Sequence, residues 1–207
     1  MPALTLQADV TVLLKRAPTE KHVPLTVFCV EHGSLAVHQR TGGRQHEAPL
    51  DLFDDADVVL TSSNQGRTWF VSEARTRLRR VGIGRGYEIL REASFFAGVV
   101  ARNPVAEDGR AAVRDLMRQA LDAFDGSPLP PGLIRLKALY AFAQGEGYPL
   151  RQHWFEGLSS NLRPRAERLI RTPLAALAGE REVAGDAARL LARLEEYLRA
   201  HTEILLD

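Results

Sequence analysis

The hydrophobic pattern of the chain changes its period near residue 82. Before that point, short runs of β-branched and large apolar residues are bounded by Pro, Gly or charged residues, which is typical of β-strands. The clearest runs are residues 10–14, 25–30, 34–38, 49–60 and 67–74. The fourth run reads as a bent strand pair or one long strand whose acidic middle faces solvent. The pattern therefore predicts a β domain at the N-terminus.

A hairpin is predicted between the second and third runs, because only Glu31-His32-Gly33 separates them. Gly33 can supply the positive φ that such a tight turn needs. The third run leads into residues 39–44, a glycine loop that contains Arg40 and Arg44. Three strands with a basic loop at one end indicate a five-stranded barrel of the OB type, a fold that often binds nucleic acid. A mixed β-meander is the alternative.

Beyond residue 86 the apolar positions recur with the 3.6-residue period of helices. Helices are predicted over residues 87–101, after residue 108, from residue 131, and over residues 164–171, 173–178 and 186–202. The fold class is therefore α+β: an OB-type domain over residues 1–82 and an all-α domain over residues 83–207. The glycines at 82, 84 and 86 are interpreted as a linker, since the spacing departs from that of a dinucleotide-binding loop.

The composition of the chain indicates a globular protein. The chain has 207 residues, 45% hydrophobic and 26% charged, which is typical of a globular protein. No apolar run approaches the length of a membrane span, and the N-terminus does not resemble a signal peptide. The single cysteine, Cys29, lies in an apolar run and is expected to be buried in a reducing compartment. We therefore expect a cytoplasmic protein.

The near balance of basic and acidic side chains argues against strong binding of nucleic acid by the chain as a whole. The net charge is +1, and residues 1–82 carry 10 basic and 9 acidic side chains. The most concentrated basic feature is Arg75, Arg77 and Arg79, which share one face of an extended segment. These arginines are predicted to contact phosphates. The alternative is that they are solvated, or paired with the acidic run at residues 54–57.

Signals of enzymatic chemistry are nearly absent. The six histidines are scattered without metal-ligand spacing, and the sequence has no phosphate-binding loop, nucleophile elbow or Cys-x-x-Cys motif. Asp54, Asp55 and Asp57 are interpreted as a solvated strand edge rather than a magnesium cluster. We therefore expect a protein that is not an enzyme and that holds no metal or other cofactor.

The helix predicted from Pro131 is apolar on nearly every side, which is typical of the buried centre of a bundle. Its two cations, Arg135 and Lys137, either extend from the ends of the helix to solvent or line a pocket for an acidic partner.

Taken in order, several segments resemble the RecO family of bacterial DNA-repair and recombination mediators. The matching segments are Leu13-Leu14, Glu20, Leu25-Thr26-Val27-Phe28, Glu31-His32-Gly33, Gly42-Gly43-Arg44, Leu50-Asp51-Leu52-Phe53, the helix around Arg135, Gly147-Tyr148, and Leu194-Glu195-Glu196-Tyr197-Leu198-Arg199-Ala200-His201. They are spread over most of the chain.

The resemblance implies an OB fold followed by helices, and a protein that binds single- and double-stranded DNA, promotes annealing and helps to load the recombinase. It implies two partners: the mediator RecR and the acidic tail of single-strand-binding protein. By position, Arg40 and Arg44 match the family's basic loop, and Arg135 matches a cation offered to the acidic tail. The chain lacks the four-cysteine zinc module of many relatives, so no zinc is expected. The alternative reading is an interaction adaptor with the same fold and little affinity for DNA.

Overall fold

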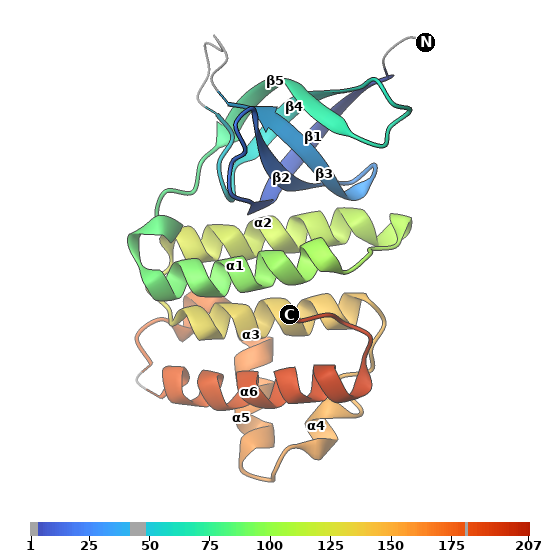
Figure 1. Cartoon of the computed structure of the whole chain (residues 1–207). Coiled ribbons are helices and arrows are strands. Elements are labelled where there is room, and N and C mark those ends of the chain that lie inside the picture. The colour runs from blue at the N-terminus through green and yellow to red at the C-terminus, as the bar shows by residue number, and fades with distance from the viewer. Residues whose placement is uncertain (1–3, 42–48, 181) are drawn as a thin grey trace. The chain divides into compact units, whose positions relative to one another are not determined.

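The computed structural model describes residues 4–41, 49–180 and 182–207. Five strands close into a barrel with the order β1-β2-β3-β5-β4 (Figure 1). The strands are β1 (Leu4–Lys15), β2 (His22–Cys29), β3 (Gly33–Arg40), β4 (Asp55–Ser62) and β5 (Trp69–Leu78). Neighbouring strands are antiparallel except β3 and β5, which are parallel and pair only at Val37↔Trp69 and His38↔Phe70. The predicted five-stranded OB-type barrel is confirmed.

The barrel interior follows from the alternation of side chains along each strand. Every second residue of the central strand segments is apolar and almost inaccessible to solvent. These residues include Val10, Val12, Leu25, Val27, Cys29, Val37, Ala56, Val58 and Leu60. Burial of this apolar area is the main term that favours closure of the barrel.

The predicted hairpin between β2 and β3 is confirmed. Cys29 pairs with Gly33, and Gly33 has a φ of +69°, which a residue with a Cβ rarely adopts. The next run differs from the prediction, because β4 begins only at Asp55 and a turn precedes it. In that turn the backbone N–H of Asp51 donates to the Asp54 carboxylate at 2.8 Å, and Phe53 has a positive φ of 67°.

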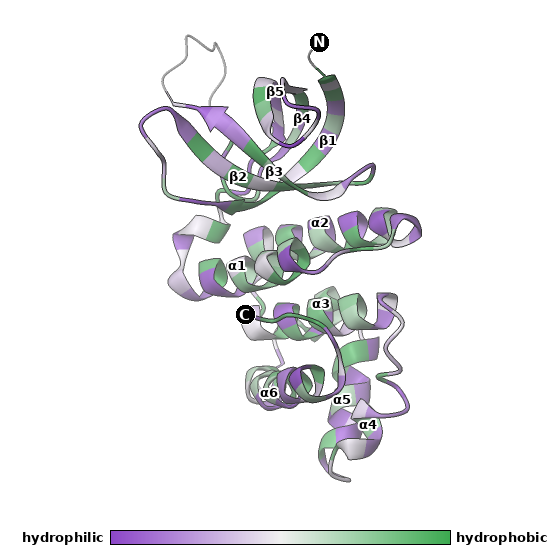
Figure 2. Cartoon of the chain, turned by 45° about the vertical axis from the view of Figure 1, so that its right-hand side comes forward, coloured by the Kyte–Doolittle hydropathy of each residue, from purple (hydrophilic) through white to green (hydrophobic). Residues whose placement is uncertain are grey.

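The rest of the chain is helical. The principal helices are α1 (Tyr87–Arg102), α2 (Arg110–Gly126), α3 (Pro131–Gly145), α4 (Trp154–Gly157), α5 (Leu162–Arg171) and α6 (Val183–His201). Figure 2 shows mixed hydrophobic and hydrophilic colours along α1, α2 and α6, as expected for amphipathic helices. Of the 15 residues of α3, eight are buried, which confirms the expectation of a central helix.

The chain divides into two compact units. One combines residues 1–80 with residues 100–114, and the other combines residues 81–99 with residues 115–207. Within the first unit, a guanidinium nitrogen of Arg110 donates to the carbonyl oxygen of Glu31 at 2.6 Å, and the Ser34 hydroxyl donates to the carbonyl oxygen of Val100 at 3.3 Å. The single domain boundary expected after residue 82 stays a prediction.

Candidate nucleic-acid interface

The outer face of β2 and β3 carries polar and aromatic side chains. Because Leu25, Val27 and Val37 point into the barrel, the residues between them point outward. His22 lies opposite Arg40 in the strand register. This is the face that OB folds use to bind extended ligands.

Three rings meet on this face, and we call His22, His38 and Phe70 the aromatic cluster. The Phe70 ring centroid lies 5.3 Å from that of His22 and 5.5 Å from that of His38, and the two imidazoles are 6.1 Å apart. All three side chains are half-buried, so each ring keeps part of its surface open to solvent. Phe70 points away from the apolar core, because it is paired with His38 at the seam between β3 and β5.

Hydrogen bonds from two threonines to backbone groups fix the strand ends beside the cluster. The Thr19 hydroxyl donates to the His22 carbonyl oxygen at 2.9 Å and accepts from the His22 N–H at 3.1 Å. Across the hairpin, the backbone N–H of Thr41 donates to the carbonyl oxygen of Lys21 at 2.9 Å, and its hydroxyl donates to that of Glu20 at 3.0 Å. The backbone that carries His22 and the end of β3 is thus held in place.

Arg40 is the cation next to the aromatic cluster. Its side chain is exposed at the end of β3, a hydrophilic segment in Figure 2. The part of the chain that the structure describes provides no carboxylate in ion-pair contact with it. Arg44, the second arginine of the predicted basic loop, lies outside the described residues.

The other three predicted phosphate contacts differ in what surrounds them. Arg75 is exposed at a position opposite Asp57, without an ion pair among the described residues. Arg77 contacts the Asp9 carboxylate and lies 3.5 Å from that of Asp57. Arg79 donates to the buried carboxylate of Asp54. Only Arg75 and Arg40 therefore present a guanidinium without competition from these carboxylates, and the role of all four in binding stays a prediction.

The acidic run at the start of β4 corrects the expectation of a solvated edge. Asp54 is 0% exposed and Asp55 is 6% exposed, while Asp57 alone is open to solvent. Asp55 accepts a hydrogen bond from the Thr11 hydroxyl at 2.6 Å and forms an ion pair with buried Arg80 at 2.8 Å. Buried charges need such partners because desolvation is costly. A linear pattern does not show which of several adjacent carboxylates faces inward.

In the helical unit, Arg135 lies within an ion-pair network. Its guanidinium nitrogens are 2.8 Å from the Glu92 carboxylate and 2.5 Å from the Glu195 carboxylate. The guanidinium carbon lies 4.3 Å from the centroid of the Phe95 ring. The side chain is 13% exposed and lines a cavity of about 340 Å³ whose lining also includes Glu88. An acidic partner would have to compete with these glutamates for Arg135.

Lys137 caps a neighbouring helix. Its ammonium group donates to the carbonyl oxygens of Leu169, Ile170 and Thr172 at 2.8, 2.8 and 2.9 Å. Burial lowers the pKa of Lys137 below its ordinary value. The three donors of the ammonium are engaged at the end of α5, and its expected contact with a partner stays a prediction.

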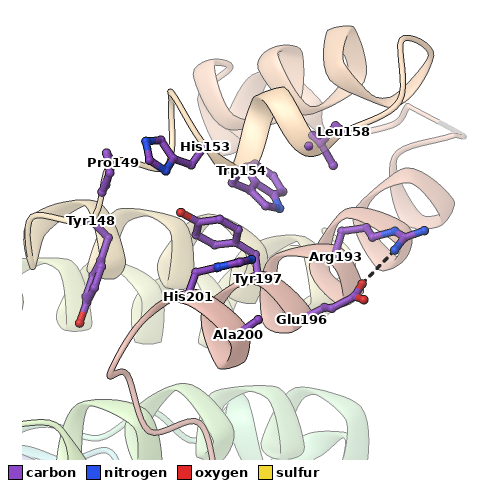
Figure 3. A pocket seen from close by; sticks show the side chains of 11 residues that line it. Tyr148, Pro149, His153, Trp154, Leu158, Arg193, Glu196, Tyr197, Ala200 and His201 are labelled. Carbon is purple, nitrogen blue, oxygen red and sulfur yellow. Dashed lines mark hydrogen bonds and ion pairs between the residues drawn. The ribbon is translucent and has the colours of Figure 1, made fainter.

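An open groove of about 770 Å³ lies elsewhere in the helical unit (Figure 3). Its lining includes Tyr148, Trp154 and Tyr197 together with His153 and His201. The indole N–H of Trp154 is buried without a hydrogen-bond partner among the described residues. The groove does not include Arg135 or Lys137.

Among the described residues, no group of three His, Cys, Asp or Glu side chains is arranged to hold a metal ion. No helix within residues 4–41, 49–180 and 182–207 combines the length and the apolarity needed to cross a membrane.

The sequence did not reveal the aromatic cluster, because His22, His38 and Phe70 are far apart along the chain. A partial signal was present: His38 and Phe70 lie in the predicted strands 34–38 and 67–74, whereas His22 precedes the predicted strand 25–30 by three residues. Strand order was needed to bring the three together.

Comparisons of the chain with protein-family models and with curated proteins found no match. The closed barrel and the side chains on its outer face are therefore the basis for assigning a function.

Proposed function

We propose that this chain is a DNA-binding recombination mediator of the RecO type that works in DNA repair in the cytoplasm. It binds single- and double-stranded DNA through phosphate contacts, promotes annealing, and assists recombinase loading together with protein partners. In this proposal the chain performs no catalysis and uses no cofactor.

One observation carries the proposal: the closed OB-type barrel presents Arg40 on its outer β2–β3 face with no carboxylate paired to it among the described residues. The strand ends on both sides of this arginine are fixed by the hydrogen bonds of Thr19 and Thr41. Because the backbone is already held, binding of a phosphate has to order only the side chain of Arg40. Arg75 on β5 supplies a second exposed guanidinium on the same unit.

Proteins are the other expected ligands. We propose a RecR-like mediator and the acidic tail of single-strand-binding protein as partners. The groove in Figure 3 supports a docking role for the helical unit, because it combines aromatic rings with His153, His201 and Arg193. Arg193 already pairs with Glu196 at 2.9 Å, so an acidic peptide would have to compete with this carboxylate for it.

An adaptor that binds proteins and has little affinity for DNA is the second candidate. Two observations favour it: the net charge is only +1, and Arg77 and Arg79 are engaged by carboxylates. A polyanion gains little from cations that are already neutralised.

Fluorescence anisotropy with a labelled single-stranded oligonucleotide, at low and at moderate salt, separates the two candidates. A mediator binds at low salt and loses affinity as salt rises, because counterions released from the phosphates drive binding. Arg40→Ala should weaken binding and make the salt dependence shallower by up to about one unit of slope.

Arg193→Ala is the matched control, because it removes an exposed guanidinium from the helical unit. It should leave DNA affinity unchanged. Absence of binding by the intact chain at low salt would reject the DNA role and leave the adaptor.

A further inference from the structure

The proposed phosphate contacts are made by arginines, so they give no role to the aromatic cluster on the outer face of the barrel. We propose that His22, His38 and Phe70 form a platform on which unpaired bases of single-stranded DNA stack, so that the barrel distinguishes single strands from duplex. This inference rests on the proposed DNA-binding function and specifies that the β2–β3 face contacts the bases of the ligand.

The three ring centroids lie between 5.3 and 6.1 Å of one another, and each ring is only half-buried. The ring planes are inclined to one another by 36–80°, so a base would stack on one ring at a time, with the other two rings at its edge. Mutual contact restricts the rotation of each ring, so the platform is formed before a base arrives. Base–aromatic stacking is a general source of affinity for single strands and tolerates any sequence, because every base has a π-face.

Arg40 places a phosphate contact beside this platform. It lies directly opposite His22 in the hairpin and two residues beyond His38 on β3, a separation of about 7 Å along the strand. A single extended strand can therefore place a base on the cluster and a neighbouring phosphate at Arg40.

The cluster should discriminate against duplex DNA because the rings can reach base faces only in a single strand. In a duplex the faces of the bases are covered by their neighbours, and unstacking one costs a few kcal/mol. The phosphates remain available in both forms. The cluster therefore adds affinity only for single strands, while Arg40 and Arg75 serve both.

The same rings also pack across strands, which stabilises a sheet, and Phe70 lies at the short seam between β3 and β5. A structural role and a stacking role differ in one measurable respect. Stacking requires bases on the ligand, whereas damage to the barrel weakens every ligand alike.

The test compares three labelled probes of equal length: oligothymidylate, the same backbone made of abasic residues, and a duplex. The first two carry the same phosphates, so their affinity ratio isolates the contribution of the bases. At moderate salt, the intact chain should bind oligothymidylate about fivefold or more tightly than the abasic strand.

Phe70→Ala should reduce that ratio towards one and leave affinity for the abasic strand nearly unchanged. Phe70→Leu keeps an apolar side chain at the seam and removes the ring, so it should have the same effect with less disturbance of the barrel. Tyr87→Ala is the control, because Tyr87 is an aromatic residue that is 78% exposed outside the barrel unit. It should leave the ratio unchanged.

The outcomes separate this inference from the proposed function. Equal binding of oligothymidylate and the abasic strand by the intact chain overturns stacking and leaves phosphate-mediated DNA binding intact. An unchanged ratio in folded Phe70→Leu likewise rejects the cluster as the platform. Failure of the intact chain to bind any probe at low salt rejects DNA binding itself.

Discussion

Arg79 binds the carboxylate of Asp54 through two of its guanidinium nitrogens, Nε at 3.0 Å and Nη2 at 2.7 Å. Asp54 is completely buried, and Nη2 also donates to the carbonyl oxygen of Pro49 at 2.8 Å. The residue that follows β5 is thereby tied to the turn that precedes β4. An arginine that a linear pattern assigns to DNA binding thus also holds together the barrel.

Replacement of Arg79 should weaken the fold more than replacement of Arg75. Arg79→Ala leaves the buried Asp54 carboxylate without its cation, and we expect a loss of about 1–3 kcal/mol in the free energy of unfolding. The loss is below that of a fully buried pair because the Arg79 side chain is 38% exposed. Arg75→Ala, which breaks no ion pair among the described residues, should stay within about 0.5 kcal/mol of the parent. Urea unfolding followed by circular dichroism measures both, and equal stability of the two variants would contradict the structural role of Arg79.

DNA affinity should depend more on Arg75 than on Arg77. Arg77 contacts the carboxylates of Asp9 and Asp57, so its charge is partly neutralised. Arg75→Ala should therefore reduce the salt dependence of binding to single-stranded DNA more than Arg77→Ala does. Anisotropy titrations at several salt concentrations give the slopes. A larger effect of Arg77→Ala would show that phosphate displaces Asp9 and Asp57 from Arg77.

Arg135 should be essential to the helical unit because it joins two carboxylates that are themselves largely buried. The side chains of Glu92 and Glu195 are 5% and 15% exposed. Arg135→Met should destabilise the chain by about 1–3 kcal/mol. The loss stays below that of a charge left wholly unpaired, because Glu92 keeps its ion pair with Arg91 at 2.7 Å and Glu195 lies 3.9 Å from Arg199. Thermal or urea unfolding measures the loss.

A second substitution tests the cause of that loss. Glu92→Gln in the Arg135→Met background removes one of the two buried carboxylates that lose Arg135 and should recover part of the stability. No recovery would mean that lost packing on Phe95 dominates.

Lys137 should make the free energy of unfolding increase with pH in the alkaline range. Burial lowers its pKa in the folded state, so between the folded and the ordinary pKa the unfolded chain binds more protons. The contribution of Lys137 to stability therefore increases as pH rises through this interval. Lys137→Met should remove that increase and, near neutral pH, cost about 1–3 kcal/mol because three carbonyl oxygens lose their donor. Urea unfolding of both proteins from pH 7 upward gives the difference, and a difference that shrinks with pH would contradict the assignment.

Cys29 should react with thiol reagents only when the barrel opens. The side chain is 0% exposed, and burial raises its pKa, so little of the reactive thiolate is present at neutral pH. Absorbance with a disulfide-exchange reagent should show slow labelling of the native chain and rapid, stoichiometric labelling in denaturant. Rapid labelling of the native chain would show that β2 is not closed into the barrel.

The sequence alone determined the strands and helices and their order, because apolar side chains must lie on one face of each strand or helix to reach a core. The period change near residue 82 and the positive φ of Gly33 were both readable for this reason. Local chemistry therefore fixed the hairpin and the buried α3, whereas the choice between a barrel and a mixed β-meander needed the closed strand order.

Only the tertiary structure decided what the polar residues do. Asp54 and Asp57 are alike in a linear pattern, yet one is completely buried beside Arg79 and the other is exposed. His22 and Phe70 are 48 residues apart in the printed sequence and meet only because strand order brings β2, β3 and β5 together. The partner of a polar side chain depends on long-range register, which hydrophobic periodicity does not specify.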